Sequence, residues 1–353
     1  MFSRSSSFAG GASRCSTWGP SGSARTLVAK CRLGTACTSA SSRSFSSMGV
    51  VGAGQMGTGI ALVAAREKVA DKVFLLDAYA PALEQSKKFA ASWVSKEVAK
   101  GRISDADGQE LLQSRLMYQK ATSSGNPPEE KELVGAWTEC ICGSSSGPAD
   151  FVIEAVSEDL GVKQNVYRML EAAGLPESAV LASNTSSISI TKLAAKLQRL
   201  PPENFIGMHF MNPVPVMTLV ELIRGLQTSD TTHAKTMDMV RRMKKDPATS
   251  EDRPGFIANR ILMPYINEAC TCLQERIGTR EDIDKIMKLG TNVPMGPLTL
   301  ADFIGLDTCL AIMRVLHQDL GDSKYRPSPL LVNYVEAGWL GKKVLRGFYE
   351  YDK

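Results

Sequence analysis

The chain has 353 residues, of which 43% are apolar and 22% charged, a composition typical of one large or two medium globular domains. No stretch approaches the ~20 consecutive apolar residues that a membrane-spanning helix needs. The formal net charge of +4 comes from residues 1–47, which carry five arginines, one lysine and no acid. Without those six cations, 35 basic residues face 37 acidic ones, a net charge of −2, so a nucleic-acid-binding protein is not indicated.

Residues 1–46 are predicted to be a transit peptide. The segment is rich in Ser and Arg and lacks acids, which is typical of mitochondrial and plastid transit peptides, and its apolar runs are too short for a secretory signal. We expect the mitochondrial matrix, with a plastid as the alternative location and a disordered tail as the alternative structure. Cleavage is expected near Arg43–Ser46, because the first strand begins at Phe45; translation from Met48 is a rival.

From Phe45 onward, short β-rich runs alternate with helical stretches, which predicts a mostly parallel sheet covered on both faces. A helix is expected over Gln55–Lys68 and a longer helical stretch over Pro81–Gln113. Residues 121–148 are rich in Gly, Ser and Pro and are predicted to be a surface loop insertion. The expected strands are Phe45–Val51, Val73–Leu76, Leu116–Gln119, Phe151–Ala155, Ala179–Ser183, Phe205–Phe210 and Thr218–Ile223.

After Lys245 the pattern becomes helical. A breaker, Asp252-Arg253-Pro254-Gly255, precedes it, and Thr279 is expected to cap one of the helices. The other expected helices are Phe256–Glu275, Leu298–Leu320 and Pro329–Trp339. The predicted fold class is therefore α/β, a Rossmann-like doubly wound, mostly parallel sheet over 47–250, followed by an all-helical domain over 251–353.

A glycine-rich turn follows the first expected strand. Gly52, Gly54 and Gly57 form a G-x-G-x-x-G pattern whose intervening Gln55 and Met56 open a helix, an arrangement that places a pyrophosphate at the helix N-terminus. Asp77 ends the next strand, where a carboxylate accepts hydrogen bonds from ribose hydroxyls and repels a 2′-phosphate. The pattern predicts NAD; FAD and a ligand-free turn are the alternatives.

One of three histidines, His209, lies at the end of an apolar strand, where polar residues of a doubly wound sheet face the ligand crevice. Glu221 lies in the next apolar strand and is expected to pair with His209 if the strands are neighbours. A histidine backed by a carboxylate suits the removal of a proton from an alcohol. The alternative is a core histidine and an independent ion pair.

Ser186 belongs to a polar cluster, Ser183 to Ser187, that directly follows another strand. Such a cluster supplies ligand-facing hydroxyls or the N-cap of the next helix, and Asn259 is similarly either a ligand contact or a core amide. The five cysteines outside the first segment lack zinc-site spacing, so no metal site is predicted.

Several motifs run in order from about Val50 to Tyr351 and include GAGQMGTGIA, ASNTSSISI, MHFMNPVPVMTLVELI and RPGFIANRIL. Together they resemble the L-3-hydroxyacyl-CoA dehydrogenases of fatty-acid β-oxidation and the related 3-hydroxybutyryl-CoA dehydrogenases. The resemblance implies NAD-dependent oxidation of an L-3-hydroxyacyl-CoA, with His209 as base and Glu221 as its partner. It also implies a homodimer formed through the helical domain.

The resemblance assigns further contacts. Substrate contacts are implied for Ser186, Asn259, Asn212 and Lys100, although Trp93 stands where the family has a CoA-contacting serine. Residues 121–148 exceed the usual family length, and Val344-Leu345-Arg346 replace a Gly-containing turn. Cofactor contacts are implied for Asp77, Glu158, Lys163, Ser186, Asn212 and Lys343.

Two other functions remain open on the sequence. One is a dehydrogenase of the same fold that acts on a 3-hydroxy acid without CoA. The other is a non-enzymatic protein that binds NAD, although the loss of His or Glu that usually marks such a protein is absent here.

Overall fold

A computed structural model describes residues 45–119, 129–143 and 147–352. The predicted transit peptide therefore lies outside the described residues, except for its last two positions, which begin the first strand. Lys120 and two parts of the predicted insertion, 121–128 and 144–146, also lie outside them. No helix among the described residues is long and apolar enough to cross a membrane.

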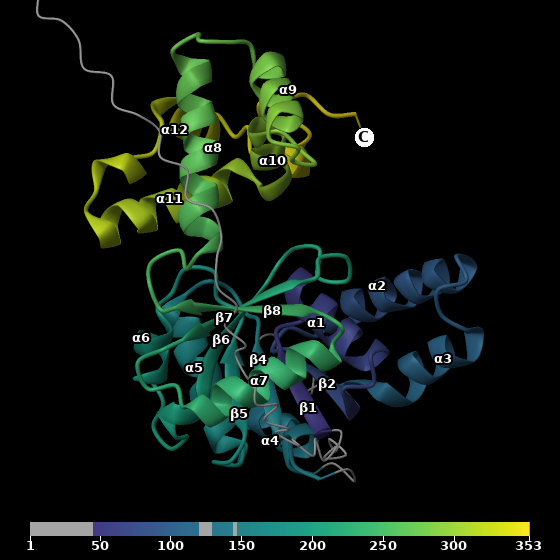
Figure 1. Cartoon of the computed structure of the whole chain (residues 1–353). Coiled ribbons are helices and arrows are strands. Elements are labelled where there is room, and N and C mark those ends of the chain that lie inside the picture. The colour runs from purple at the N-terminus through teal and green to yellow at the C-terminus, as the bar shows by residue number, and fades with distance from the viewer. Residues whose placement is uncertain (1–44, 120–128, 144–146, 353) are drawn as a thin grey trace, which may run out of the picture. The chain divides into compact units, whose positions relative to one another are not determined.

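The first part of the described chain is a doubly wound sheet of eight strands in the order β3-β2-β1-β4-β5-β6-β7-β8 (Figure 1). Strands β1 to β6 pair in parallel, β7 is antiparallel to β6, and β8 is parallel to β7. Since the order turns back at β1, the carboxyl ends of β1 and β4 mark the point where such sheets bind ligands. The strands are β1 (Phe45–Val51), β2 (Ala70–Leu76), β3 (Leu116–Tyr118), β4 (Phe151–Glu154), β5 (Val180–Ser183), β6 (Phe205–Phe210), β7 (Leu219–Arg224) and β8 (Asp246–Glu251).

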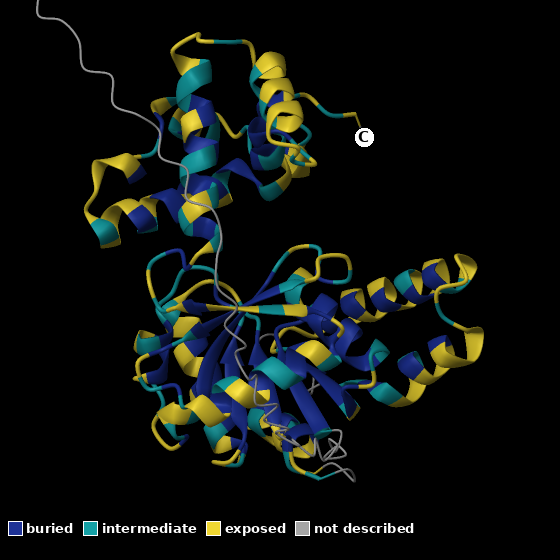
Figure 2. Cartoon of the chain, viewed as in Figure 1, coloured by how far each residue is buried: buried dark blue, intermediate teal, exposed yellow. Residues whose placement is uncertain are grey.

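Alternate strand residues supply two apolar cores, one on each face of the sheet, as period-two side-chain alternation requires. Val50 and Ile153 belong to the core under α1, α2 and α7, whereas Val51 and Val152 belong to the core under α4, α5 and α6. Figure 2 shows the strands buried between these helices. The helices are α1 (Gln55–Arg66), α2 (Ala80–Ala99), α3 (Asp105–Glu110), α4 (Glu130–Ile141), α5 (Leu160–Ala172), α6 (Ile190–Ala194) and α7 (Asp230–Arg242), with the short helices η1 (Leu111–Arg115) and η2 (Pro202–Asn204).

The elements from Ala258 onward are helices that enclose a third apolar core, apart from isolated bridges near the end of the described chain. Met263, Leu310 and Phe348 lie in this core. The helices are α8 (Ala258–Gln274), α9 (Arg280–Gly290), α10 (Pro297–Ile304), α11 (Leu306–Leu320), α12 (Pro329–Glu336), η3 (Ser323–Tyr325) and η4 (Lys342–Val344).

Two expectations about elements are wrong. Residues 130–141 form the helix α4 rather than loop, and its Leu133, Trp137 and Ile141 are buried because they recur every fourth residue along one helix face. The chain after Lys245 was expected to be helical, but it begins with the strand β8. The polar sequence of this strand, DPATSE, lacks the β-branched and aromatic residues that usually mark a strand.

Two long helical stretches are interrupted. Pro81–Gln113 divides after Ala99, where Gly101 has a φ of +68° and Ser104 caps α3. Leu298–Leu320 divides into α10 and α11 at Gly305, whose φ of +104° favours glycine.

Candidate active site

His209 and Glu221 meet across two neighbouring strands. They are directly opposed in the antiparallel register of β6 and β7, so their side chains project from the same face of the sheet. Both are buried, and His209 Nδ1 lies 3.1 Å from Glu221 Oε2. The pairing that the sequence made conditional on neighbouring strands is thus present.

The second oxygen of Glu221 bonds the beginning of α8. Its Oε1 accepts hydrogen bonds from the backbone amides of Ile257, at 2.7 Å, and Ala258, at 3.3 Å. Burial raises the pKa of Glu221, but the hydrogen bonds from His209 and these amides outweigh burial and lower the pKa below its ordinary value. Glu221 is therefore a carboxylate at neutral pH.

The charge of Glu221 determines which nitrogen of His209 carries the proton. Because a carboxylate only accepts hydrogen bonds, Nδ1 of His209 must be the donor, and Nε2 of the neutral ring keeps its lone pair. Within the described part of the chain, Nε2 has no hydrogen-bond partner. The arrangement leaves a basic nitrogen available for a ligand.

A second group joins Glu158, Ser186 and Asn259. Glu158 Oε1 accepts hydrogen bonds from the backbone amide of Ser186, at 2.8 Å, and from its Oγ, at 3.2 Å. Asn259 Nδ2 donates to the carbonyl oxygen of Ser186 at 3.1 Å, which leaves its other N–H for a ligand. Burial opposes ionisation of Glu158, yet the Lys163 charge and the hydrogen bonds that Glu158 accepts from residues 185–187 lower its pKa overall. Three predicted site residues from three separate elements thus lie together.

The glycine-rich turn fits a dinucleotide pyrophosphate. Gly52 has a φ of +105°, and a Cβ there would stand 2.6 Å from the carbonyl oxygen of Ala155. A Cβ at Gly54 would meet no described heavy atom within 4 Å beyond its chain neighbours, so the space above the helix is open. Since α1 has no acid in its first turn and no described side chain caps it, its first amides remain available to an anion.

Asp77 and Asn212 flank this turn. Asp77 follows β2, and its Oδ2 accepts a hydrogen bond from the amide of Ala53 at 2.6 Å, which fixes the carboxylate beside the turn. Gln55 Nε2 donates to Asn212 Oδ1 at 3.2 Å, which joins the turn to the loop after β6. Met56 is half-buried and packs against the core under α1.

Two family models match the chain. The model described as "3-hydroxyacyl-CoA dehydrogenase, NAD binding domain" matches residues 47–125 and 142–253, and the one described as "3-hydroxyacyl-CoA dehydrogenase, C-terminal domain" matches residues 255–351. The chain belongs to the 3-hydroxyacyl-CoA dehydrogenase family. The predicted family, enzyme class and NAD cofactor are confirmed, and the unmatched residues 126–141 contain all of α4.

Individual relatives agree. A 3-hydroxybutyryl-CoA dehydrogenase from Bradyrhizobium diazoefficiens is 49% identical over 304 residues, which cover 86% of this chain and 94% of that protein. A human protein named hydroxyacyl-coenzyme A dehydrogenase, mitochondrial, is 37% identical over 303 residues, which cover 86% of this chain and 90% of that protein. The crystal structure of an (S)-3-hydroxybutyryl-CoA dehydrogenase from Ralstonia eutropha is similar at a TM-score of 0.75 and 43% identity, covering 88% of this chain and all of that one. The last similarity confirms the predicted fold class.

Of three further predicted contact residues of this dehydrogenase, Lys163 contacts the second group, whereas Lys100 and Lys343 bond acids outside both groups. Lys163 is 1% exposed, and its Nζ bonds Glu154 Oε1 at 2.8 Å and lies 3.4 Å from Glu158 Oε2. Lys100 Nζ lies 3.2 Å from Glu97, and Lys343 Nζ lies 2.6 Å from both oxygens of Asp307. Each of the three ammonium groups is thus occupied by an acid of the chain.

Sequence reasoning missed a buried network around Glu154, the last residue of β4. Its Oε1 also accepts from the amide of Val156, and its Oε2 accepts from Tyr167, at 3.0 Å, and Ser183, at 2.7 Å. Two features of the sequence could have revealed this network. An acid ends an apolar strand, and Lys163 and Tyr167 lie one turn apart on the helix that follows. The network supports the β4 and β5 ends, next to the loop of Ser186.

Proposed function

We propose that this dehydrogenase oxidises the 3-hydroxyl of an L-3-hydroxyacyl-CoA to a 3-oxo group, with His209 as base. The observation that carries the proposal is the buried His209–Glu221 pair, whose remaining imidazole nitrogen is free among the described residues. His209 Nε2 takes the hydroxyl proton as hydride leaves C3. Bound NAD⁺ supplies the hydride acceptor, so the proton and the hydride together balance the loss of two hydrogens.

Each neighbouring residue has a proposed role. Glu221 holds the ring in one tautomer and stabilises the imidazolium that forms. Ser186, Asn259 and Asn212 hold the substrate in place, so much of the rate gain is positioning. For the cofactor, we propose that Gly54 admits the pyrophosphate, while Gly52 allows the tight turn and Gly57 allows α1 to pack closely on the end of β1. Further contacts are proposed for Gln55, Met56, Asp77, Glu158, Lys163 and Lys343.

A cavity of about 470 Å³ beside α2 supports a CoA substrate. Trp93 lines it, and the Arg66 guanidinium lies 5.6 Å from the centre of the Trp93 ring. The lining has five basic and three acidic side chains, a positive balance that suits phosphates, and each basic group is also in an ion pair with an acid of the chain. Lys100 follows the C-terminal end of α2, the helix that carries Trp93. The basic lining residues are Arg66, Lys68, Arg102, Arg115 and Lys244.

The experiment that tests the function is NADH formation with 3-hydroxyacyl-CoAs of several chain lengths. Free 3-hydroxy acids serve as controls, and so does the D enantiomer of the best thioester. We expect turnover with the L-thioesters alone. Equal turnover with a free 3-hydroxy acid would favour the dehydrogenase without CoA dependence, and NADH binding without any turnover would favour a binding protein.

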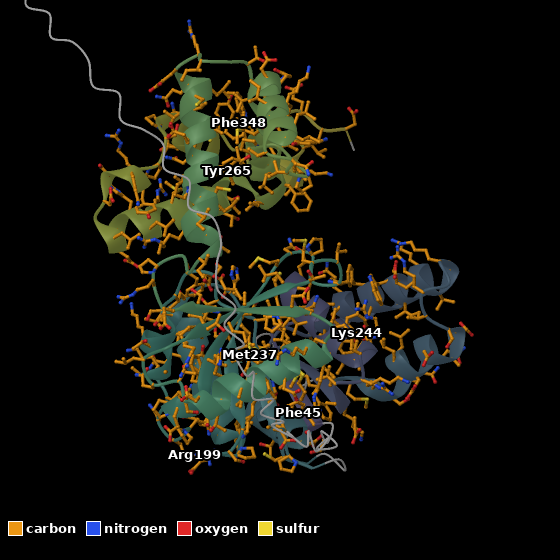
Figure 3. All side chains as sticks on the ribbon, in the orientation of Figure 1. Phe45, Arg199, Met237, Lys244, Tyr265 and Phe348 are labelled. Carbon is orange, nitrogen blue, oxygen red and sulfur yellow. The ribbon has the colours of Figure 1, made fainter. Side chains whose placement is uncertain are left out.

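We also propose a homodimer formed through the helical domain. An apolar groove of about 320 Å³ lies between α8 and α9, lined by residues that include Tyr265, labelled in Figure 3, and Ile286. Ile261 on α8, Leu289 on α9 and Ile277 between these helices are at least two thirds exposed, a concentration that a second copy would cover. Light scattering should give twice the chain mass, and Ile286→Lys should reduce it; an unchanged mass would contradict the groove as the interface.

Import into mitochondria is proposed from the composition of residues 1–47 and from the likeness to the human mitochondrial protein. A fusion of residues 1–60 to a fluorescent protein should enter the matrix, whereas Arg→Gln changes at the five arginines should leave it in the cytosol. Plastid import or cytosolic retention of the unchanged fusion would contradict the proposal.

A further inference from the structure

Lys245 is a buried cation that the proposed reaction does not use. It lies between α7 and β8, next to Lys244, which Figure 3 labels, and it is 6% exposed. Its Nζ donates hydrogen bonds to the carbonyl oxygens of Val214, at 2.7 Å, and Met217, at 2.6 Å. Within the described residues, these two carbonyls are its hydrogen-bond partners, and no carboxylate forms an ion pair with it.

Both carbonyls belong to the loop that joins β6 to β7. The strand before this loop carries His209, and the strand after it carries Glu221. The loop begins near Asn212, whose side chain bonds Gln55 of the glycine-rich turn. A fixed loop therefore holds the base, its partner and one flank of the dinucleotide turn in register.

The loop is held from a second side. Val214 is buried against α1, so closely that a Cβ built at Gly59 would stand 2.9 Å from the Cβ of Val214. Pro213 contributes a turn, because its carbonyl accepts from the amides of Val216 and Met217, both at 3.0 Å. The loop is thus held between the Lys245 side chain and the backbone of α1 at Gly59, which has no side chain.

The free-energy cost of burying the Lys245 ammonium group indicates that this lysine does more than fill space. Burial lowers the pKa of Lys245, and the nearby Arg66 charge lowers it further, while Glu67 opposes them. An ammonium group buried without an ion-pair partner is costly, but hydrogen bonds from a charged donor to two carbonyls are among the stronger ones in proteins. An apolar residue would fill the space at less cost if only packing were needed.

We propose that Lys245 is a positioning residue for cofactor and substrate binding, acting through the loop that carries Asn212. The inference rests on the proposed function for the identity of the site. Lys245 contacts neither the reacting hydroxyl nor the hydride acceptor; it fixes the positions of Asn212 and of the ends of β6 and β7.

The test compares Lys245→Met, which keeps the length of the side chain but removes its donors, with Lys235→Met, a matched loss of an exposed lysine on α7. NADH binding is measured by fluorescence without any acyl-CoA, and kcat and KM are measured separately. We expect the NADH Kd and the KM for NAD⁺ of Lys245→Met to rise at least about tenfold, the equivalent of about 1.4 kcal/mol. Lys235→Met should match the unchanged enzyme.

A purely structural role would give a different result. It would lower the melting temperature and the active fraction, and it would leave the NADH Kd and both KM values of the folded fraction unchanged; that result would overturn the proposal. Because NADH binding is measured without substrate, a wrong substrate assignment leaves this readout intact.

If Lys245→Met does not fold, Gly59→Ala tests whether the position of the loop between β6 and β7 controls NADH binding. This change pushes Val214 from the α1 side without removing the lysine, and alanine is otherwise favoured in a helix. We expect the same rise in NADH Kd, and normal binding by folded Gly59→Ala would also overturn the proposal.

Discussion

Two buried carboxylates in the same sheet, Glu154 and Glu221, are used in different ways. Glu154 is saturated, since Lys163, Tyr167, Ser183 and a backbone amide occupy both of its oxygens. Glu221 bonds an imidazole whose other nitrogen is free among the described residues. Burial and charge alone therefore do not distinguish a supporting acid from one that takes part in the reaction. The difference is whether the acid's partner keeps an atom that can still bond a ligand, as His209 does with Nε2.

The largest expected effect is at the reactive pair. Replacing His209 with Gln should lower kcat by about 10²–10⁴, the usual contribution of a general base, because Nε2 no longer accepts the hydroxyl proton. NADH binding should be unchanged, as measured by fluorescence titration. A variant with near-normal turnover would remove His209 from its role as base.

The saturated site should respond in stability instead. Lys163→Met leaves Glu154 buried without its cation, and breaking such a pair costs about 3–5 kcal/mol of unfolding free energy, to be measured by urea denaturation. The predicted cofactor contact of Lys163 is tested in the same variant. Weaker NADH binding at unchanged stability would show that Lys163 acts on the cofactor and would break the comparison.

Glu221→Gln tests the pair from its other side. We expect a loss in kcat of about 10–10²-fold, smaller than for His209→Gln, because the ring loses the charge that stabilises the imidazolium but keeps a polar neighbour. The pH–rate profile should also change. Should both the rate and the profile match those of the unchanged enzyme, the pairing would have no catalytic part.

The smallest effect is expected from Glu158→Gln. Because the folded-state pKa of Glu158 lies below its ordinary value of 4.5, its carboxylate stabilises the fold above that value, and the stabilisation is lost as pH falls through the lowered pKa. The difference in unfolding free energy between Glu158→Gln and the unchanged enzyme should therefore be present at pH 7 and shrink below about pH 4.5. A difference independent of pH would contradict the lowered pKa.

The sequence predicted the fold class and seven strands because their apolar, β-branched runs alternate with amphipathic helices. It missed β8, since Asp246–Glu251 is polar and begins Asp-Pro, a composition that a strand tolerates at the edge of a sheet. It missed α4 because the Gly-, Ser- and Pro-rich flanks hid the spacing of Leu133, Trp137 and Ile141. Boundaries at Gly101 and Gly305 depend on backbone angles that composition does not reveal.

In the candidate site, contacts between consecutive strands could be predicted from the sequence, whereas contacts between distant segments could not. The His209–Glu221 contact follows from two consecutive strands, so a conditional prediction was possible. The bonds from Glu158 to Ser186 and from Asn259 to Ser186 join segments 28 and 73 residues apart, and only the folded chain reveals them. The same holds for Lys245, whose partners are carbonyl groups that every residue carries.

The two edges of the sheet have a consequence for how the enzyme behaves while it folds. Among the described strands, the outermost are β3, with three residues, and β8, which carries Pro247 and charged or hydroxyl side chains. A short strand offers few free N–H and C=O groups to a neighbouring molecule, and a proline removes one donor altogether. A partly folded chain that exposes this sheet therefore presents poor templates for strand addition, which should favour refolding over aggregation at high concentration.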